Sequence, residues 1–147
     1  MKKICVVGGG RFGINHIKTL YEMGNLAGIV EINSERLNEL LSEYPVKGYS
    51  DLQFALDDGF DGFVVATPAP THYALGKQII EADYPVLIEK PMTLKASESL
   101  ELVELAKEKK VNLMVGHLLL FHPAIRKIKE EIDEDLIGDI RYIYSTR

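Results

Sequence analysis

Residues 4–13 read ICVVGGGRFG, an aliphatic run of four residues that leads directly into a glycine-rich turn. The glycines at positions 8, 10 and 13 fit the pattern G-x-G-x-x-G. A single match to this pattern is weak, but here it follows an expected strand and precedes apolar residues at helical spacing, which is the context that gives it meaning. The stretch therefore predicts a strand, a tight turn and a helix at the start of the chain.

The same alternation continues along the chain. Short β-branched or aliphatic runs do not alternate with polar residues, which is typical of parallel strands that are covered on both faces. The segments between them place apolar residues at helical spacing, as at Leu37, Leu40 and Tyr44. Strands are expected at residues 4–7, 29–31, 47–49, 63–66, 86–88 and 113–115. Strand–helix alternation with short connections indicates βαβ units, so we predict an α/β fold with a doubly wound, Rossmann-type parallel sheet.

Composition sets limits on what the chain can bind. A length of 147 residues, with 46% hydrophobic and 27% charged residues, is typical of one globular domain in solution. The formal net charge of −5 argues against nucleic acid or an anionic membrane as a partner, because both require clustered lysine and arginine. Cys5, the only cysteine, cannot form an internal disulfide, and no apolar run is long enough to span a membrane. We therefore expect a cytoplasmic protein.

Each glycine of the turn has an expected task if the turn binds a dinucleotide. Gly8 permits the tight turn, Gly10 lets the backbone approach the pyrophosphate, and Gly13 allows the helix to pack closely on the strand. The start of the following helix adds partial positive charge for the phosphates. Arg11 and Phe12 complete the turn and are expected beside the cofactor. The alternative is a flexible glycine connection that binds nothing.

Glu31 is the expected ribose-binding acid. It ends the second strand, 18 residues after Gly13, close to the usual spacing of about 20 residues. A carboxylate there can accept hydrogen bonds from the 2′-hydroxyl of the adenosine ribose and would repel a 2′-phosphate, which favours NAD over NADP. Arg36 lies near enough in sequence to leave some tolerance for NADP, and the alternative role of Glu31 is a solvated charge at the strand end.

Lys90 is the candidate catalytic residue. It belongs to one of three polar groups that follow the later strands, at residues 67–72, 89–91 and 116–117, and open parallel sheets bind ligands beyond these strand ends. Hydride transfer from an alcohol carbon requires a base or a polarising cation beside the hydroxyl. A lysine near an oxidised nicotinamide loses its proton more easily because of the like charge. Pro91 restricts Lys90 to extended geometry, and the alternative is an ordinary surface lysine.

The histidines are weaker candidates. His117 either lines the substrate side of the nicotinamide or bonds a neighbouring loop. His72 is expected in the first turn of a helix with Thr71 as its N-cap, where a structural role is favoured, as it is for His16 and His122. No group of histidine, cysteine and carboxylate residues has metal-ligand spacing, so no metal is expected.

The end of the chain reads as the beginning of another domain. Pro123 is well placed to start a helix, and residues 139–147, aromatic and β-branched, indicate a strand without following sequence to pair with. That strand adds to the existing sheet, pairs with another chain, or is the first strand of a further domain, which we favour. We assign residues 1–122 to the dinucleotide-binding domain and residues 123–147 to a connecting helix and the first strand of an otherwise absent substrate and dimerisation domain.

These motifs together resemble the glucose–fructose oxidoreductase/inositol dehydrogenase (Gfo/Idh/MocA) family. The resemblance rests on the GGGRFG turn, the acid after the second strand, the TPxxTH and EKP groups and the segment GHLLLFHPAI, and it runs from residue 3 to about residue 147. It implies that Lys90 is the catalytic-site lysine and that the Lys90–Pro91 peptide is cis. The residues that it places along the ribose and nicotinamide are Thr67, Pro68, His72 and Glu89.

The resemblance also implies an activity. Members oxidise or reduce a carbon of sugars, inositols or nucleotide sugars with NAD or NADP, and a second α/β domain binds substrate and often mediates dimerisation. The LLLFHPAI segment is similar to that of nucleotide-sugar 3-dehydrogenases, although His122 stands where many members have asparagine.

The sequence therefore predicts the cofactor-binding part of an NAD-dependent dehydrogenase, with a sugar or nucleotide sugar as substrate and a homo-oligomer as one possible assembly. A non-catalytic NAD(H)-binding module or partner subunit, and a truncated gene product, remain the alternatives.

Overall fold

Six parallel strands form one sheet in the order β3-β2-β1-β4-β5-β6. The computed structural model describes residues 1–146, which divide into two units, one from Met1 to Gly116 and the other from His117 onward. The strands of the first unit are β1 (Ile4–Val7), β2 (Leu26–Val30), β3 (Lys47–Tyr49), β4 (Gly62–Val65), β5 (Val86–Ile88) and β6 (Leu113–Val115). Its helices are α1 (Gly13–Glu22), α2 (Ser34–Glu43), α3 (Leu52–Leu56), η1 (Ala69–Thr71), α4 (His72–Glu81) and α5 (Ala96–Lys109).

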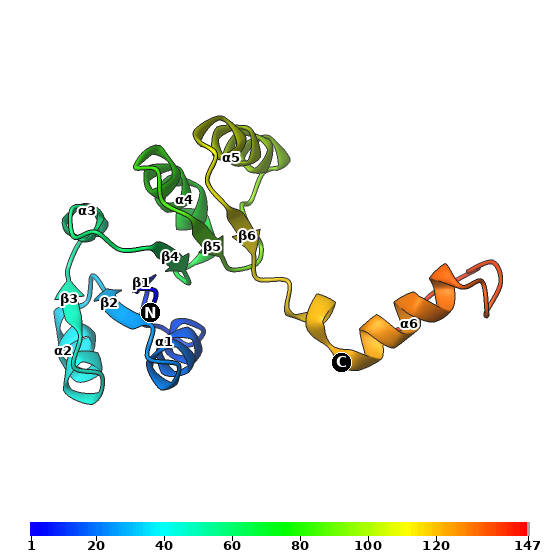
Figure 1. Cartoon of the computed structure of the whole chain (residues 1–147), viewed down its shortest axis with the longest axis horizontal. Helices are drawn as coiled ribbons and strands as arrows, with labels where there is room; N and C mark the ends of the chain where they lie inside the picture. The colour runs from blue at the N-terminus through cyan, green and yellow to red at the C-terminus, as the bar shows by residue number, and fades with distance from the viewer. Residues whose placement is uncertain (147) are drawn as a thin grey trace. The chain divides into compact units, whose positions relative to one another are not determined.

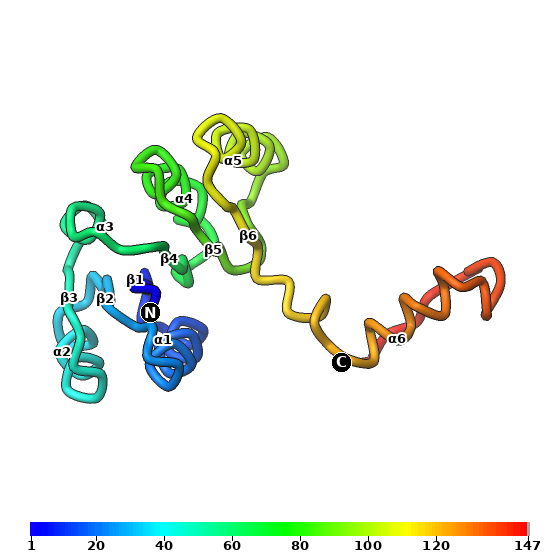
Figure 2. Tube along the Cα trace, in the orientation of Figure 1, coloured from blue at the N-terminus to red at the C-terminus, as the bar shows by residue number. Residues whose placement is uncertain are grey.

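The strand order reverses between β1 and β4. The chain moves outward from β1 through β2 to β3 and then returns to the other side of β1, as the trace in Figure 2 shows. This 3-2-1-4-5-6 order is that of the doubly wound dinucleotide-binding fold, so the predicted architecture is confirmed. Two strands are shifted from their predicted positions, since β2 starts at Leu26 and β4 at Gly62.

The buried residues of each strand divide between the two faces of the sheet. Cys5 and Val7 belong to the cluster that packs under α3, α4 and α5, whereas Val6 belongs to the cluster with Ile17 of α1 and Leu40 of α2. Figure 1 shows the same division, with α1 and α2 on one side of the sheet and α3, α4 and α5 on the other. Successive residues of β1 are therefore all apolar because both faces of the sheet are covered there. Burial also raises the pKa of the Cys5 thiol.

The register of the sheet aligns the carboxyl ends of the strands. Val7 of β1 is paired with Val30 of β2 and with Val65 of β4, while Ile88 of β5 is paired with Val65 and with Val115 of β6. The connections that follow these strands consequently start at the same edge. The residues in those first positions are Gly8, Glu31, Ala66, Glu89 and Gly116.

The second unit contains η2 (Leu118–Phe121) and α6 (Pro123–Asp133). Pro123 is the first residue of α6, as predicted, and the His122 ring caps the helix by accepting a hydrogen bond from the Ala124 N–H at 3.2 Å. The predicted strand at residues 139–147 does not form within its described part, residues 139–146, because a strand is stable only against a paired neighbour. Residue 147 lies outside the described residues, and the assignment of residues 1–122 and 123–147 to separate domains stays a prediction.

Residues 1–146 lack two features that would indicate a membrane or a metal as a partner. No helix among them is long and apolar enough to cross a membrane. They also contain no group of three or more histidine, cysteine or acidic side chains arranged to hold a metal ion.

Candidate functional site

The glycine turn between β1 and α1 has three positions where an added Cβ would crowd its neighbours, and at Gly9 that Cβ would lie 2.3 Å from the Leu40 Cδ1 atom. Gly8 has a φ of +98°, and a Cβ there would lie 2.9 Å from the Thr67 Cγ2 atom. A Cβ at Gly13 would overlap the Gly8 carbonyl oxygen, so helix α1 could not approach the strand as closely. Gly10 differs, since a Cβ there would meet no atom within 4 Å. The turn therefore needs Gly8 and Gly13 for its own packing, while Gly10 faces open space.

The same turn offers hydrogen-bond donors to an anion. Within residues 1–146, the backbone N–H groups of Gly10, Arg11 and Phe12 have no hydrogen-bond acceptor, whereas the Gly9 N–H donates to a Glu31 carboxylate oxygen at 2.8 Å. The three unpaired groups lie at the start of α1, where the helix dipole adds partial positive charge. A dinucleotide pyrophosphate, with its negatively charged oxygens, fits these donors.

Both oxygens of the Glu31 carboxylate accept backbone hydrogen bonds. One is 2.8 Å from the Gly9 nitrogen and the other is 3.0 Å from the Asn33 nitrogen. These bonds join the connection after β2 to the glycine turn, so Glu31 is an anchored group rather than a freely solvated charge. Arg36 donates from Nε to the Gly9 carbonyl oxygen at 3.1 Å and also pairs with Glu39, so its guanidinium is already engaged.

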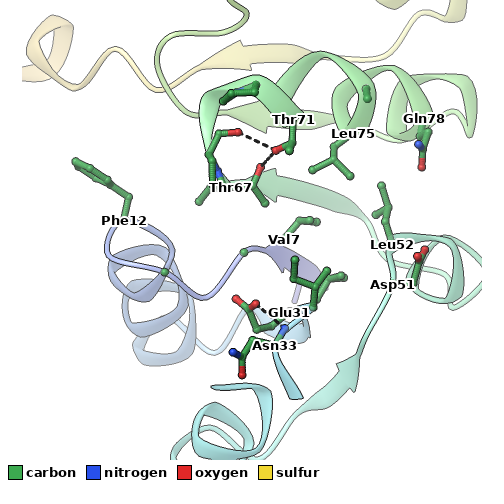
Figure 3. A pocket seen from close by; sticks show the side chains of 18 of the residues that line it. Val7, Phe12, Glu31, Asn33, Asp51, Leu52, Thr67, Thr71, Leu75 and Gln78 are labelled. Atoms are coloured by element: carbon green, nitrogen blue, oxygen red, sulfur yellow. Dashed lines mark hydrogen bonds between the residues drawn. The ribbon is translucent and has the colours of Figure 1, made fainter. Parts of the chain in front are cut away.

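A cavity of about 1080 Å³ lies along this edge of the sheet. Figure 3 shows Glu31 and Asn33 on one side of it, and Thr71 of η1 with Leu75 and Gln78 of α4 on the other. The residues that line it and that the sequence predicted are Gly8, Gly10, Arg11, Phe12, Glu31, Thr67 and Pro68. The cavity is large enough for a cofactor, since small-molecule sites usually measure about 300–1,000 Å³.

Sequence reasoning missed the part of the cavity that follows β3. Asp51, Leu52 and Gln53 line it, and the Asp51 carboxylate caps α3 by accepting a hydrogen bond from the Gln53 N–H at 2.8 Å. An aspartate directly before an apolar helix start is an N-cap signal, and it could have placed these residues at the carboxyl edge. The five-residue helix α3 is too short to show a clear helical period.

The connection after β4 leads into η1 and α4 and contains the candidate residues Thr67, Pro68 and His72. His72 was expected along the ribose and nicotinamide, but its side chain is only 1% exposed and both ring nitrogens bond backbone carbonyl oxygens. The predicted place of His72 along the ribose and nicotinamide stays a prediction. Thr71 is the N-cap residue by position, yet its hydroxyl donates to the Pro68 carbonyl oxygen at 2.8 Å and not to the helix.

Glu89 joins three elements of the first unit. Its carboxylate lies 2.8 Å from Nε2 of His16 on α1 and 3.2 Å from the Lys90 nitrogen, which donates to it. A Cβ at Gly116, after β6, would come within 2.9 Å of the same carboxylate. Glu89 is 6% exposed, and these contacts hold its neighbours in place, while its predicted position beside the cofactor stays a prediction.

Lys90 is exposed at the same edge of the sheet. Its Nζ atom lies 5.0 Å from the centre of the Phe12 ring, so the ammonium lies over the face of this ring, which belongs to the glycine turn. No carboxylate within residues 1–146 forms an ion pair with Lys90. The Lys90–Pro91 peptide is cis, as the family resemblance implied. The structure thus brings the predicted catalytic lysine and the predicted cofactor turn into contact.

His117 belongs to the second unit, where its carbonyl oxygen accepts a hydrogen bond from the Leu120 N–H at 3.0 Å. Its predicted place beside the nicotinamide stays a prediction.

Comparison with known proteins shows which protein family has this arrangement. The sequence model described as "Oxidoreductase family, NAD-binding Rossmann fold" matches residues 2–117. That match spans more than half of the chain, and the chain therefore belongs to the Gfo/Idh/MocA oxidoreductase family, with the NAD-binding Rossmann fold at residues 2–117. The family resemblance and the nicotinamide cofactor predicted from the sequence are confirmed.

Individual relatives are dehydrogenases of sugar-like compounds. UDP-N-acetylglucosamine 3-dehydrogenase of Acidithiobacillus ferrooxidans is 31% identical, with 85% of this chain and 40% of the relative aligned. Inositol 2-dehydrogenase 1 of Saccharopolyspora erythraea is 33% identical over 93% of this chain and 43% of its own length. The crystal structure of GenD2 from gentamicin A biosynthesis, in complex with NAD, superposes with a TM-score of 0.86 at 29% identity, covering 94% of this chain and 41% of that protein. The chain thus spans about two fifths of the length of these relatives.

Proposed function

We propose that this chain supplies the cofactor-binding part of an NAD-dependent dehydrogenase that acts on a secondary alcohol of a sugar, polyol or nucleotide sugar. The observation that carries the proposal is the contact between Lys90 and Phe12, which places an amine next to the turn whose N–H groups are unpaired within residues 1–146. The relatives' activities on UDP-N-acetylglucosamine and inositol support the substrate class.

Binding follows from the donors and acceptors at the carboxyl edge. The N–H groups of Gly10, Arg11 and Phe12 bind the pyrophosphate, and Thr67 and Pro68 line the path toward the nicotinamide. Glu31 accepts hydrogen bonds from the ribose hydroxyls, because each carboxylate oxygen retains a lone pair beyond its backbone bond. The same negative charge disfavours the 2′-phosphate of NADP.

The residues that line the cavity at the carboxyl edge would hold NAD⁺, which would supply the hydride acceptor for the alcohol carbon. Lys90 takes the hydroxyl proton as a neutral amine, or polarises the hydroxyl as an ammonium, from its position over the Phe12 ring. Glu89 holds the Lys90 backbone through the N–H bond, and the link from Glu89 to His16 fixes the carboxylate against α1. His117 is proposed to line the substrate side.

The proposal also covers the cellular location and the binding partners of the enzyme. A cytoplasmic location is supported by the single, buried and unpaired cysteine, which suits a reducing compartment. The proposed partners are a sugar or nucleotide-sugar substrate and a second copy of the protein.

Titration of the chain with NADH, followed by nicotinamide fluorescence, tests the cofactor role. We expect saturable binding that is tighter for NADH than for NADPH. Glu31→Gln is expected to weaken NADH binding by about tenfold or more, the cost of losing a hydrogen bond to a charged group. Glu35→Gln, an exposed acid on α2, is the matched control and leaves affinity unchanged. A folded chain that binds neither dinucleotide would refute the proposal.

Turnover separates the enzyme from a non-catalytic NAD(H)-binding module. Both hypotheses require the same cofactor residues, so NADH binding does not distinguish them. Oxidation of a panel of sugars, inositols and UDP-sugars by the longest natural form of the protein supports the dehydrogenase. Tight NADH binding by that form without turnover of any of these alcohols favours the module.

A further inference from the structure

The cavity along the carboxyl edge of the sheet extends beyond Glu31 to the connection after β3. Figure 3 shows Phe12 at one end of it and Asp51 at the other, with Glu31 between them. A dinucleotide is a linear chain of base, ribose, pyrophosphate, ribose and nicotinamide. With the pyrophosphate on the glycine turn and the nicotinamide toward Lys90, the base falls at the Asp51 end.

The walls of this end are apolar. Figure 3 shows Leu52 of α3 and Leu75 of α4 facing each other across the cavity, and Ile32, after β2, lines it as well. Ile32 is 86% exposed, so its side chain is open to a ligand. An aromatic ring can bury its faces on such walls, and a few polar groups at its edge then fix its orientation and identity.

Three polar side chains line the cavity at the same end. The Asp51 carboxylate accepts a hydrogen bond from the Gln53 N–H at 2.8 Å through Oδ1, and its Oδ2 atom has no donor within residues 1–146. The carboxamides of Gln53 and Gln78 form no hydrogen bond with any residue in that range. These groups can therefore bond the edge of a ring that lies between the apolar walls.

The two kinds of polar group differ in what they can select. A carboxamide both donates and accepts, so the side chains of Gln53 and Gln78 can turn to suit an amino group or a carbonyl oxygen. A carboxylate only accepts, so it favours a ring whose edge carries a donor. Adenine has an amino group at C6, whereas guanine and hypoxanthine have an oxygen there. The choice between these bases therefore depends on Asp51.

We infer that Asp51 is a specificity-determining residue that selects adenine as the base of the dinucleotide, with its carboxylate accepting a hydrogen bond from the 6-amino group. The bond from the Gln53 N–H holds this carboxylate on the cavity wall. The inference rests on the proposed function, since it requires a dinucleotide with its pyrophosphate on the glycine turn. It assigns the choice of base to the end of the cavity that is remote from the reacting carbon.

Two variants separate this role from that of a helix cap. Asparagine and serine cap helices about as well as aspartate, so α3 keeps its start in Asp51→Asn and Asp51→Ser. Unlike a carboxylate, an amide or a hydroxyl can also donate to an oxygen at C6. Asp57→Asn, at the other end of α3 and not among the residues that line the cavity, is the matched control.

The measurement compares NADH with reduced nicotinamide hypoxanthine dinucleotide, in which an oxygen replaces the 6-amino group. Binding of both is followed by nicotinamide fluorescence. We expect the unaltered chain and Asp57→Asn to bind NADH about tenfold more tightly, the effect of one hydrogen bond to a charged group. Asp51→Asn and Asp51→Ser should bind the two dinucleotides with affinities that agree within about twofold.

Equal affinities of the unaltered chain for the two dinucleotides would overturn the inference, as would a preference for NADH that survives in the Asp51 variants. Either result leaves the proposed function intact, because NADH still binds. A folded chain that binds neither dinucleotide overturns the proposed function and the choice of base together.

Discussion

Replacing Gly116 by alanine tests whether Glu89 is held where the structure places it. An alanine Cβ at this position would lie 2.9 Å from the Glu89 Cδ and Oε2 atoms and 3.0 Å from Oε1. Because these atoms form the end of a side chain, the carboxylate moves and the backbone stays. We therefore expect Gly116→Ala to break the bonds from Glu89 to His16 and to the Lys90 N–H.

The magnitude follows from the bonds that are lost. A hydrogen bond that involves a charged group contributes about 1.5–3 kcal/mol, and leaving a nearly buried carboxylate without partners costs a similar amount. Alanine also stabilises by about 0.4–1 kcal/mol because the unfolded chain has less freedom than with glycine. With two such bonds broken and the alanine gain subtracted, the net expected loss in the free energy of unfolding is about 2–5 kcal/mol, equivalent to a fall in Tm of roughly 4–20 °C.

A double-mutant cycle with Glu89→Ala makes the test specific. In the Glu89→Ala background the space beside residue 116 is vacated, so Gly116→Ala should cost nothing or stabilise slightly. Urea unfolding of the four proteins provides the free energies. Equal costs of Gly116→Ala in both backgrounds would show that the substitution acts on the backbone and that the contact with Glu89 has no energetic role.

Three further predictions concern other parts of the chain. Gly13→Ala should destabilise the fold by more than about 3 kcal/mol in thermal unfolding, because the added Cβ overlaps the Gly8 carbonyl oxygen and backbone cannot rotate away; a stable variant would contradict the packing of α1. The Lys3 N–H and then the Lys2 ammonium lower the pKa of Asp61, so the stabilisation from its carboxylate is present above the pKa of the unfolded chain and is lost as the pH falls through the lower pKa of the folded state; Asp61→Asn should lower stability at pH 7 and by progressively less as the pH falls through that range, and a constant difference would argue against the assigned cause. Lys90→Ala should abolish turnover by the longest natural form of the protein with NADH affinity nearly unchanged; undiminished turnover would exclude the catalytic role.

The sequence was sufficient for the sheet and for the edge at which the site lies. Apolar runs that end in glycine or a charged residue predicted the strand ends, because strands covered on both faces cannot carry polar residues until they leave the core. Gly8, Glu31 and Glu89 all follow such runs, and the register confirms that they start their connections at one edge.

Contacts between distant residues could not be predicted in the same way. His72 and Pro91 are 19 residues apart and meet only because β4 and β5 are neighbours, so the sequence pattern contains no sign of their bond. Glu89 and His16 are 73 residues apart. Residues 139–146 have the composition of a strand but form none. Aromatic and β-branched residues predict a strand only where a neighbouring strand can pair with them.

A ¹H–¹⁵N titration of the chain with NADH tests the central claim most directly. We predict that the largest shifts occur at the amides of Gly10, Arg11 and Phe12, whose N–H groups donate to no acceptor within residues 1–146, with further shifts at Thr67. Shifts confined to the opposite edge of the sheet, around Asp61, or no saturable shift at the glycine turn, would contradict the account.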